Sequence, residues 1–224
     1  MDRPLADQDW RLIPEESRTG PMNMALDIVA ARSAASGGPR TIRVYRWDPS
    51  TLSLGYSNKP EDINWEFCNQ EGIDVIRRPT GGGAIYHDYE GDISYSIIAP
   101  AEDLPSELLD AYHICCAPIR RLDIEAAYAN DAKPAIHEPT CYLRDLHPAH
   151  DILVDQCKIS GNAQYRQRDS VIQHGSISFD LHPRQHLNCF DNPPKIEEFT
   201  NRVTSIRGEC GADRSVAVST LETT

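Results

Sequence analysis

Residues 77–88 read Arg77-Arg78-Pro79-Thr80-Gly81-Gly82-Gly83-Ala84-Ile85-Tyr86-His87-Asp88, and this stretch says most about the fold. Three consecutive glycines separate two runs of strand-forming residues. Without side chains they let the backbone approach a bound molecule and turn its N–H groups toward an anion. The arginines just upstream can donate charge-assisted hydrogen bonds to phosphate or carboxylate. The stretch predicts a ligand-binding loop, with a plain glycine hairpin and solvated arginines as the alternative.

Two other stretches carry residue types that suit acyl chemistry. Lys158 begins the run Lys-Ile-Ser-Gly-Asn-Ala-Gln, among apolar and small residues of an expected strand. A lysine that only improves solubility rarely has apolar and small residues as its neighbours, although a lysine on a surface strand is the simpler interpretation. Cys141 follows Pro139-Thr140 in an expected loop. It is either a nucleophile or a packing residue, and cysteines more often pack.

Apolar periodicity and chain-breaking residues outline the elements around these motifs. A first helix is expected at residues 21–35, with Met22, Ala25, Leu26, Val29 and Ala30 on its buried face. Further helices are expected at 60–70, from Pro105 with an apolar stripe of Leu108, Leu109, Tyr112, Cys115, Cys116 and Ile119, and at 196–202. Strands are expected at 41–47, 51–56, 73–77, 84–87, 92–99, 151–154, 158–167 and 170–181. This order predicts one α+β domain over residues 1–224.

Composition excludes several classes of function. The 224 residues include 34 acidic and 22 basic side chains, a formal net charge of −12, which disfavours broad nucleic-acid binding through phosphate neutralisation. No apolar run approaches the roughly 20 residues of a membrane helix. The seven cysteines include no CxxC pair, so reduced thiols are expected rather than disulfides or a zinc site. We expect a cytoplasmic protein with no metal site and no nucleic-acid or membrane partner.

Taken together, the motifs resemble the lipoate–protein ligase and octanoyltransferase family, which shares the biotin/lipoate protein ligase (BPL/LPL) catalytic domain. The matching segments, in family order, are Asn23–Asp27, Tyr45–Trp47, Leu52–Gly55, Arg77–Asp88, Lys158–Gln164, Gln173–Ser176 and Val203–Ile206. The resemblance implies a central mixed, mostly antiparallel β-sheet flanked by helices, like that of biotin ligases and class II aminoacyl-tRNA synthetases.

The resemblance also implies which residues form the site. In this family the glycine loop and its arginine line the acyl site, and the lysine contacts the activated carboxyl group. The implied catalytic residues are Cys141 and Lys158. The implied substrate-binding residues are Arg77 or Arg78, Gly81, Gly82, Gly83, His87, Asp151, Gly161 and Asn162.

Two chemistries occur in the family. Octanoyltransferases pass an octanoyl or lipoyl group from acyl carrier protein to a lipoyl-domain lysine without a cofactor, and one branch uses a cysteine shortly before the lysine motif. Cys141 stands seventeen residues before Lys158, which favours this branch and a Cys141 thioester. Ligases instead need ATP and magnesium, and some need an accessory subunit. His150-Asp151 keeps the acid of the ligases' Asn-Asp pair but lacks the asparagine.

The implied partners are lipoyl domains of 2-oxoacid dehydrogenase complexes or the glycine-cleavage H protein, with acyl carrier protein as the donor. Two other functions remain as alternatives. One is a non-catalytic lipoyl- or biotin-binding regulatory module. The other is a cysteine hydrolase in which His137, His147 or His150 acts as the base for Cys141. Neither explains the glycine loop together with Lys158.

Overall fold

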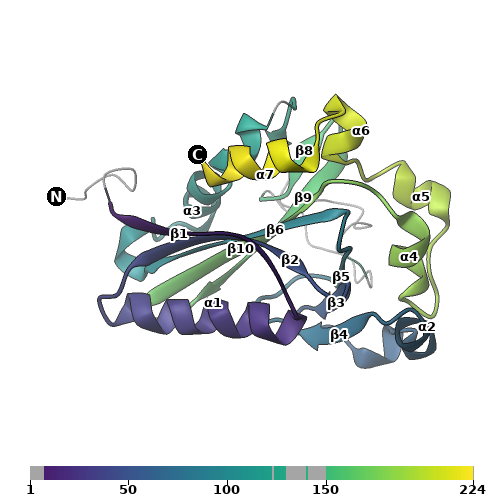
Figure 1. Ribbon diagram of the computed structural model, residues 1–224, viewed down its shortest axis with the longest axis horizontal. Helices are drawn as coiled ribbons and strands as arrows, with labels where there is room; N and C mark the ends of the chain where they lie inside the picture. Colours follow the sequence, from purple (N-terminus) through teal and green to yellow (C-terminus); the bar gives the residue numbers. More distant parts are fainter. Residues whose placement is uncertain (1–7, 123, 130–139, 141–149, 224) are drawn as a thin grey trace.

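Two β-sheets form the centre of the protein in a computed structural model, which describes residues 8–122, 124–129, 140 and 150–223 (Figure 1). The large sheet has the strand order β1-β2-β6-β10-β9-β8-β7, and the small sheet has the order β4-β3-β5. The strands are β1 (Trp10–Arg18), β2 (Arg40–Trp47), β3 (Thr51–Leu54), β4 (Asp74–Arg77), β5 (Ile85–His87), β6 (Asp92–Pro100), β7 (Ala127–Tyr128), β8 (Ile152–Val154), β9 (Cys157–Arg166) and β10 (Ser170–Ser178).

Seven α-helices and three short 3₁₀ helices accompany these strands in the described part of the chain. They are α1 (Gly20–Ala35), η2 (Pro60–Asp62), α2 (Trp65–Gln70), η3 (Ala101–Asp103), α3 (Leu108–Cys115), η4 (Ala117–Arg121), α4 (Pro183–Asn188), α5 (Ile196–Thr200), α6 (Ile206–Cys210) and α7 (Arg214–Glu222). Strands β1 and β2 pair in parallel, as do β3 and β4, and the other pairings of the described strands are antiparallel. The predicted α+β class with a mixed, mostly antiparallel sheet is confirmed.

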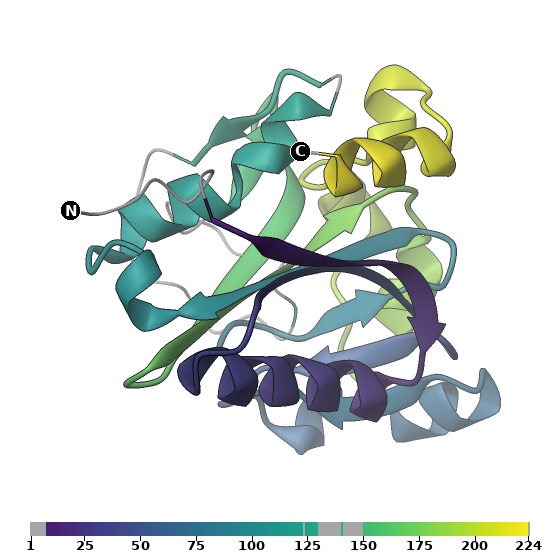
Figure 2. The same ribbon diagram turned by 60° about the vertical axis from the view of Figure 1, so that its left-hand side comes forward.

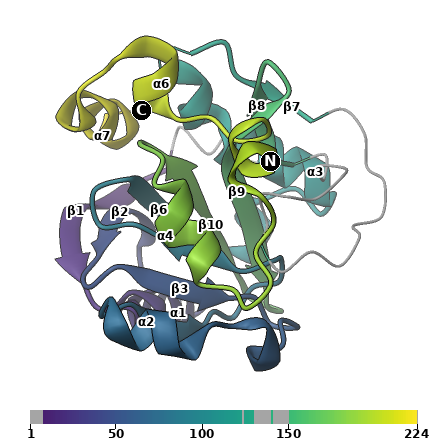
Figure 3. The same cartoon turned by 90° about the vertical axis from the view of Figure 1, so that its right-hand side faces the viewer.

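The large sheet is covered on both faces. Helix α1 packs Ala30, Ala31 and Ala34 against Ile98 and Ile172 on one face, and it crosses beneath the sheet in Figure 2. Helices α3 and α7 cover the opposite face, where the largest hydrophobic cluster lies. Figure 3 shows the small sheet and α2 on the α1 side.

The sequence reading missed β1. Its residues, Trp-Arg-Leu-Ile-Pro-Glu-Glu-Ser-Arg, are mostly polar, and Pro14 interrupts them. Proline is tolerated at an edge strand or a bulge because it cannot donate a ladder hydrogen bond. Strand β1 is the edge of the large sheet, and its register against β2 shifts between Ile13 and Glu16. None of its residues is fully buried, which explains why no clear alternation of apolar and polar residues appears.

The first helix is confirmed within one residue, but its predicted buried face is wrong. Met22 and Val29 are 49% and 60% exposed. The helix instead buries a face that includes two polar residues; its buried residues are Gly20, Asn23, Met24, Asp27, Ala30, Ala31 and Ala34. Asn23 and Asp27 are 0% exposed because both bond to the guanidinium of Arg43 on β2. A tertiary partner thus overrides the apolar stripe.

Several other boundaries differ from expectation. The helix expected at 60–70 is a 3₁₀ turn followed by the short α2, and the strands expected at 51–56 and 170–181 end at Leu54 and Ser178. In α3 the stripe holds from Tyr112 onward, whereas Leu108 and Leu109 are exposed, and Pro118 lies in a separate 3₁₀ turn. Helices α4, α6 and α7 were not expected. None of the helices within residues 8–122, 124–129 and 150–223 is long and apolar enough to cross a membrane.

Candidate functional site

A pocket lies between the two sheets, with about 560 Å³ of empty space that includes open solvent at its mouth. We call it the central pocket. The large sheet contributes Tyr45, Trp47, Ser94, Lys158, Gly161, Asn162, Ala163, His174, Gly175 and Ser176, and the small sheet contributes Ser53, Ile85 and His87. The other lining residues are Met24, Arg78, Gly81, Gly82, His150 and Asp151. It brings together eight of the predicted site residues: Arg78, Gly81, Gly82, His87, Asp151, Lys158, Gly161 and Asn162.

Lys158 and Asp151 form an ion pair in the wall of this pocket. Lys158 Nζ donates to Asp151 Oδ2 at 2.7 Å, and each residue is 2% exposed. The surface-strand interpretation of Lys158 is therefore wrong. Moving two charges out of water costs several kcal/mol each, and their attraction often only offsets that cost, so such a pair is weak as a stabilising device. Its place in the wall of the central pocket keeps Lys158 and Asp151 as candidate site residues.

Two positions, one in the glycine loop and one beside it, require glycine for physical reasons. Gly82 has φ of +94°, a left-handed conformation that other residues adopt only with strain. The loop also packs against Gly55, where an added Cβ would lie 2.0 Å from the carbonyl oxygen of Gly82. Gly81 and Gly82 are exposed at the pocket, whereas Gly83 is buried and does not line it. The loop thus presents bare main chain to the pocket through its first two glycines.

The structure separates the two adjacent arginines. Arg77 is exposed, does not line the central pocket, and donates to the carbonyl oxygens of Gly55, Tyr56 and Asn58. It orders the loop that follows β3. Arg78 is 5% exposed and lines the pocket. Of the two candidates, Arg78 is the one placed at the site.

Arg78 uses its whole guanidinium within the protein. Nη2 donates to the carbonyl oxygens of Gly81 and Gly83, each at 2.7 Å, and so fixes both ends of the glycine turn. Nη1 donates to the carbonyl oxygen and the hydroxyl of Ser53, at 2.8 and 3.1 Å, and Nε donates to Thr80 Oγ1 at 3.1 Å. These bonds employ all five N–H groups of the side chain. Arg78 therefore shapes the loop, in contrast to the direct phosphate contact expected from sequence.

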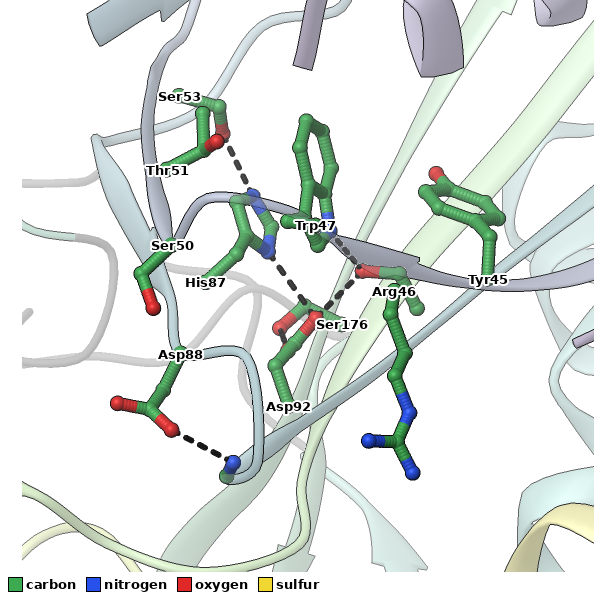
Figure 4. Close-up of polar contacts among 12 residues, drawn as sticks. Tyr45, Arg46, Trp47, Ser50, Thr51, Ser53, His87, Asp88, Asp92 and Ser176 are labelled. Carbon is green, nitrogen blue, oxygen red and sulfur yellow. Dashed lines mark hydrogen bonds and ion pairs between the residues drawn. The ribbon is translucent and has the colours of Figure 1, made fainter. Parts of the chain in front are cut away.

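His87 lies in the middle of a buried hydrogen-bonded network (Figure 4). Its Nε2 lies 2.8 Å from Ser53 Oγ and its Nδ1 lies 3.2 Å from Asp92 Oδ2. The ring stacks on Trp47, with centroids 4.1 Å apart. Asp92 also accepts from the hydroxyls of Ser94 and Ser176. Burial lowers the pKa of His87 despite the opposing effect of Asp92, so the ring is neutral near neutral pH.

A second network was missed by sequence reasoning. His174 lines the central pocket, its Nε2 lies 2.6 Å from Thr80 Oγ1, and its Nδ1 lies 3.6 Å from Asp27 Oδ2. Asp27 is paired with Arg43 and accepts from Ser96 at 2.7 Å. The signal for these residues was present, because Asn23–Asp27 and Gln173–Ser176 are among the matching family segments. Only the spatial contact shows what they do.

Asn162 links β9 to the segment that carries Asp151. Its Oδ1 accepts from the hydroxyl of Tyr95 at 2.7 Å, and its Nδ2 donates to the carbonyl oxygen of His150 at 3.2 Å. The His150 ring stacks on Tyr112 with centroids 4.2 Å apart. Gly161 is buried beside this group and leaves room at the pocket wall. These contacts hold the backbone just before Asp151 in place.

Cys141 lies outside the described residues, as do His137 and His147. The residue before it, Thr140, is described and buried, and it pairs in parallel with Ala84, directly after the glycine loop. Thr140 Oγ1 lies 2.8 Å from His186 Nε2. The chain is thus anchored beside the loop one residue before Cys141.

His186 gives a test of the packing around this anchor. Burial lowers its pKa from 6.5 to about 3, so only the unfolded chain takes up this proton between those values. Because the unfolded state then binds more protons, stability is complete above about pH 6.5 and decreases below it. We expect this residue to cost about 2 kcal/mol of unfolding free energy between about pH 7.5 and 5.

Urea unfolding at both pH values measures the effect. His186→Gln, which keeps a polar group for Thr140 but cannot ionise, should show a smaller acid loss than the wild type. His113→Gln is the matched control, because His113 is exposed. Equal acid losses in His186→Gln and the wild type would contradict a neutral, buried His186.

The described part of the chain has no group of side chains that could bind a metal ion. No group of three or more His, Cys, Asp or Glu side chains lies close enough there to hold an ion. The arrangement that is present, a buried ammonium beside an apolar slot and a main-chain turn, suits reaction at a carbonyl group. A positioned ammonium stabilises the oxyanion that forms when a nucleophile attacks an acyl carbon.

The fold and this site define a class of protein. The structure superposes on lipoate-protein ligase A bound with ATP with a TM-score of 0.76 at 21% identity, covering 95% of this chain and 82% of that one. It superposes on the bi-partite lipoate protein ligase of Thermoplasma acidophilum, studied with its E2 lipoyl domain, with a TM-score of 0.71 at 18% identity, covering 96% and 81%. The chain therefore has the lipoate ligase fold.

The sequence then shows the particular family. Residues 19–222 match the lipoyl protein ligase A/B catalytic domain, and the chain belongs to that family. Octanoyltransferase LipM of Halalkalibacterium halodurans is 34% identical over 201 residues, which span 83% of this chain and 71% of the relative. The resemblance inferred from the motifs is confirmed.

Proposed function

We propose that this protein is an octanoyltransferase that moves an octanoyl group from acyl carrier protein to a specific lysine of a lipoyl domain. The buried Lys158–Asp151 pair in the wall of the central pocket carries the proposal. The LipM relative, at 34% identity, bears the name of that activity. The T. acidophilum ligase studied with an E2 lipoyl domain supports a lipoyl domain as the acceptor. The family match over residues 19–222 supports a single catalytic domain.

The pocket suits an extended acyl chain. It spans strands β2, β6, β10 and β9, three strand spacings or about 14 Å. Lys158 on β9 marks one end, and Tyr45 and Trp47 on β2, with Met24 of α1, mark the other. We assign the carbonyl group to the Lys158 end, because a buried ammonium there can bond to a developing oxyanion. The tail then lies toward the aromatic end.

The proposed reaction has two balanced steps. The Cys141 thiolate attacks the octanoyl thioester, an oxyanion forms and collapses, and the carrier leaves as a thiolate that takes up a proton. The lipoyl-domain lysine, as a free amine, then attacks the Cys141 thioester, forming an amide and releasing the Cys141 thiol. Thioester exchange is nearly neutral in free energy and aminolysis is favourable, so no nucleotide is needed. Lys158 stabilises the oxyanion in both steps.

An acylation assay with and without ATP tests the proposal. Octanoyl-acyl carrier protein and a lipoyl domain, without nucleotide, should give octanoylated lipoyl domain by intact mass. Adding ATP and magnesium should not increase the yield, and free octanoate or lipoate with ATP should give no product. Product that forms only from the free acid and ATP would instead establish the ligase chemistry, in which Asp151 would help to hold magnesium and the adenylate.

A further inference from the structure

Two of the three histidines that line the central pocket, His87 and His174, share one unusual feature, which is that both are linked through a hydroxyl to the same guanidinium. Arg78 Nη1 donates to Ser53 Oγ, which contacts His87, and Arg78 Nε donates to Thr80 Oγ1, which contacts His174. The far nitrogen of each ring faces a carboxylate. His87 faces Asp92 of β6 and His174 faces Asp27 of α1. The same order of groups, guanidinium, hydroxyl, imidazole and carboxylate, therefore occurs twice.

The direction of the first chain follows from its two ends. An ionised carboxylate only accepts, so the His87 Nδ1 that faces Asp92 Oδ2 at 3.2 Å must carry a proton. A neutral ring has one N–H, and burial keeps this ring neutral by lowering its pKa. Its Nε2 is then an acceptor, and the hydroxyl of Ser53 must donate to it at 2.8 Å. Ser53 Oγ then accepts from Arg78 Nη1 with one of its two lone pairs.

The second chain has the same order. Thr80 Oγ1 accepts from Arg78 Nε at 3.1 Å and lies 2.6 Å from His174 Nε2. The Asp27 carboxylate lies 3.6 Å from His174 Nδ1, an ion-pair distance that is too long for a hydrogen bond. Asp27 also accepts from Arg43 and Ser96, which hold it in place. Because Thr80 Oγ1 already accepts from Arg78, its hydroxyl hydrogen is available to donate to His174 Nε2.

We propose that Arg78 is a positioning residue that directs two proton-ordered relays, Arg78–Ser53–His87–Asp92 and Arg78–Thr80–His174–Asp27, and that these relays fix the separation of the two sheets around the acyl chain. Each relay begins at Arg78, which holds the glycine loop, and ends on an element outside the small sheet, on β6 or α1. A proton on either Nε2 would point a second donor at a hydroxyl that already accepts from Arg78, and the hydroxyl hydrogen would lose this acceptor. The proposed relays therefore place the proton of each ring on Nδ1.

Imidazole nitrogen NMR on protein with ¹⁵N-labelled histidine tests the relays directly. At neutral pH both rings should be the Nδ1–H tautomer. Ser53→Ala should alter only the His87 signals, Thr80→Val only the His174 signals, and Arg78→Lys both. The control is Thr51→Val, which removes a buried hydroxyl of β3 that bonds to the Pro49 carbonyl and not to a histidine (Figure 4 shows Thr51 beside Ser53). It should change neither.

Activity supplies the second readout, and this part rests on the proposed function. Ser53→Ala and Thr80→Val should each lower kcat/KM about three- to tenfold, mainly through KM. Thr80→Ser, which keeps the hydroxyl, should restore it. In Ser53→Ala the acid limb of the rate profile should move to higher pH. The titratable and charged groups that face His87 are Asp92, Arg78, His174 and His186, and Ser53→Ala leaves all four in place.

The NMR and activity results test the two relays separately from the proposed octanoyl transfer. An Nε2–H tautomer or a doubly protonated ring at neutral pH in the wild type would overturn the proposal, as would Arg78→Lys with unchanged signals from both rings. A protein with the expected tautomers but no octanoyl transfer would leave the relays standing and reject the proposed function.

Discussion

Octanoyl transfer should fall about 10²- to 10³-fold when the Lys158–Asp151 ion pair is replaced by the neutral pair Lys158→Met with Asp151→Asn. Removing one preorganised donor to an oxyanion costs about 2.7–4 kcal/mol in the barrier. Lys158 Nζ is 2.7 Å from Asp151 Oδ2 and is the ammonium that the central pocket presents in the described structure. The measurement is the initial rate of lipoyl-domain octanoylation.

The paired replacement avoids a confusion that Lys158→Met alone would create. Removing one partner of a buried ion pair typically destabilises a protein by about 3–5 kcal/mol, so a single variant could lose activity by unfolding. Urea unfolding of the double variant checks that it is folded. Lys59→Met is the matched control, because Lys59 is exposed. A folded double variant that keeps more than a tenth of the wild-type rate would reject the role of Lys158.

Cys141→Ala should reduce transfer to background, a loss of at least roughly 10³-fold, because the thioester pathway has no other nucleophile. In the absence of a lipoyl domain, the wild-type protein should accumulate an octanoyl adduct after mixing with octanoyl-acyl carrier protein. Cys141→Ser should either form a stable ester or remain unmodified. Intact mass measures each outcome, and digestion places the adduct on Cys141.

Two other cysteines, Cys210 and Cys116, serve as controls for the role of Cys141. Cys210→Ala removes an exposed thiol and should leave the rate and the adduct unchanged. Cys116 is buried beside Tyr95, and burial raises its pKa to about 12, so it is not a competing nucleophile. Full transfer by Cys141→Ala, or an adduct on another cysteine, would contradict the thioester mechanism while leaving a direct attack by the lipoyl-domain lysine.

The local motifs could be recognised from the sequence without knowledge of the tertiary structure. Three glycines between two strand-forming runs predict the turn at residues 81–83. The apolar surroundings of Lys158 are unusual for a solubilising lysine, and the family resemblance implies its catalytic role. The glycine turn and the burial of Lys158 are present in the structure because each depends on short-range chemistry. A glycine at φ +94° is required by the turn itself. Lys158 is buried because its own strand is buried, with Ile159 and Ser160 at 0% exposure.

Long-range partners account for what the sequence could not predict. The face of α1 was misjudged because Asn23 and Asp27 find their partner, Arg43, on a strand that lies 16 or more positions away along the chain. The polar edge strand β1 carries too little one-sided apolar patterning to be recognised before its neighbour is known.

The sequence by itself therefore determined the family, the α+β class, the glycine turn and the identity of Lys158 as a candidate. Tertiary structure alone decided that Arg78 rather than Arg77 faces the pocket, that His174 lines it with Asp27 behind, and that Asp151 pairs with Lys158. The physical reason is that turn geometry and apolar patterning act between near neighbours in the chain, whereas a buried charge or polar group depends on whichever distant residue satisfies it.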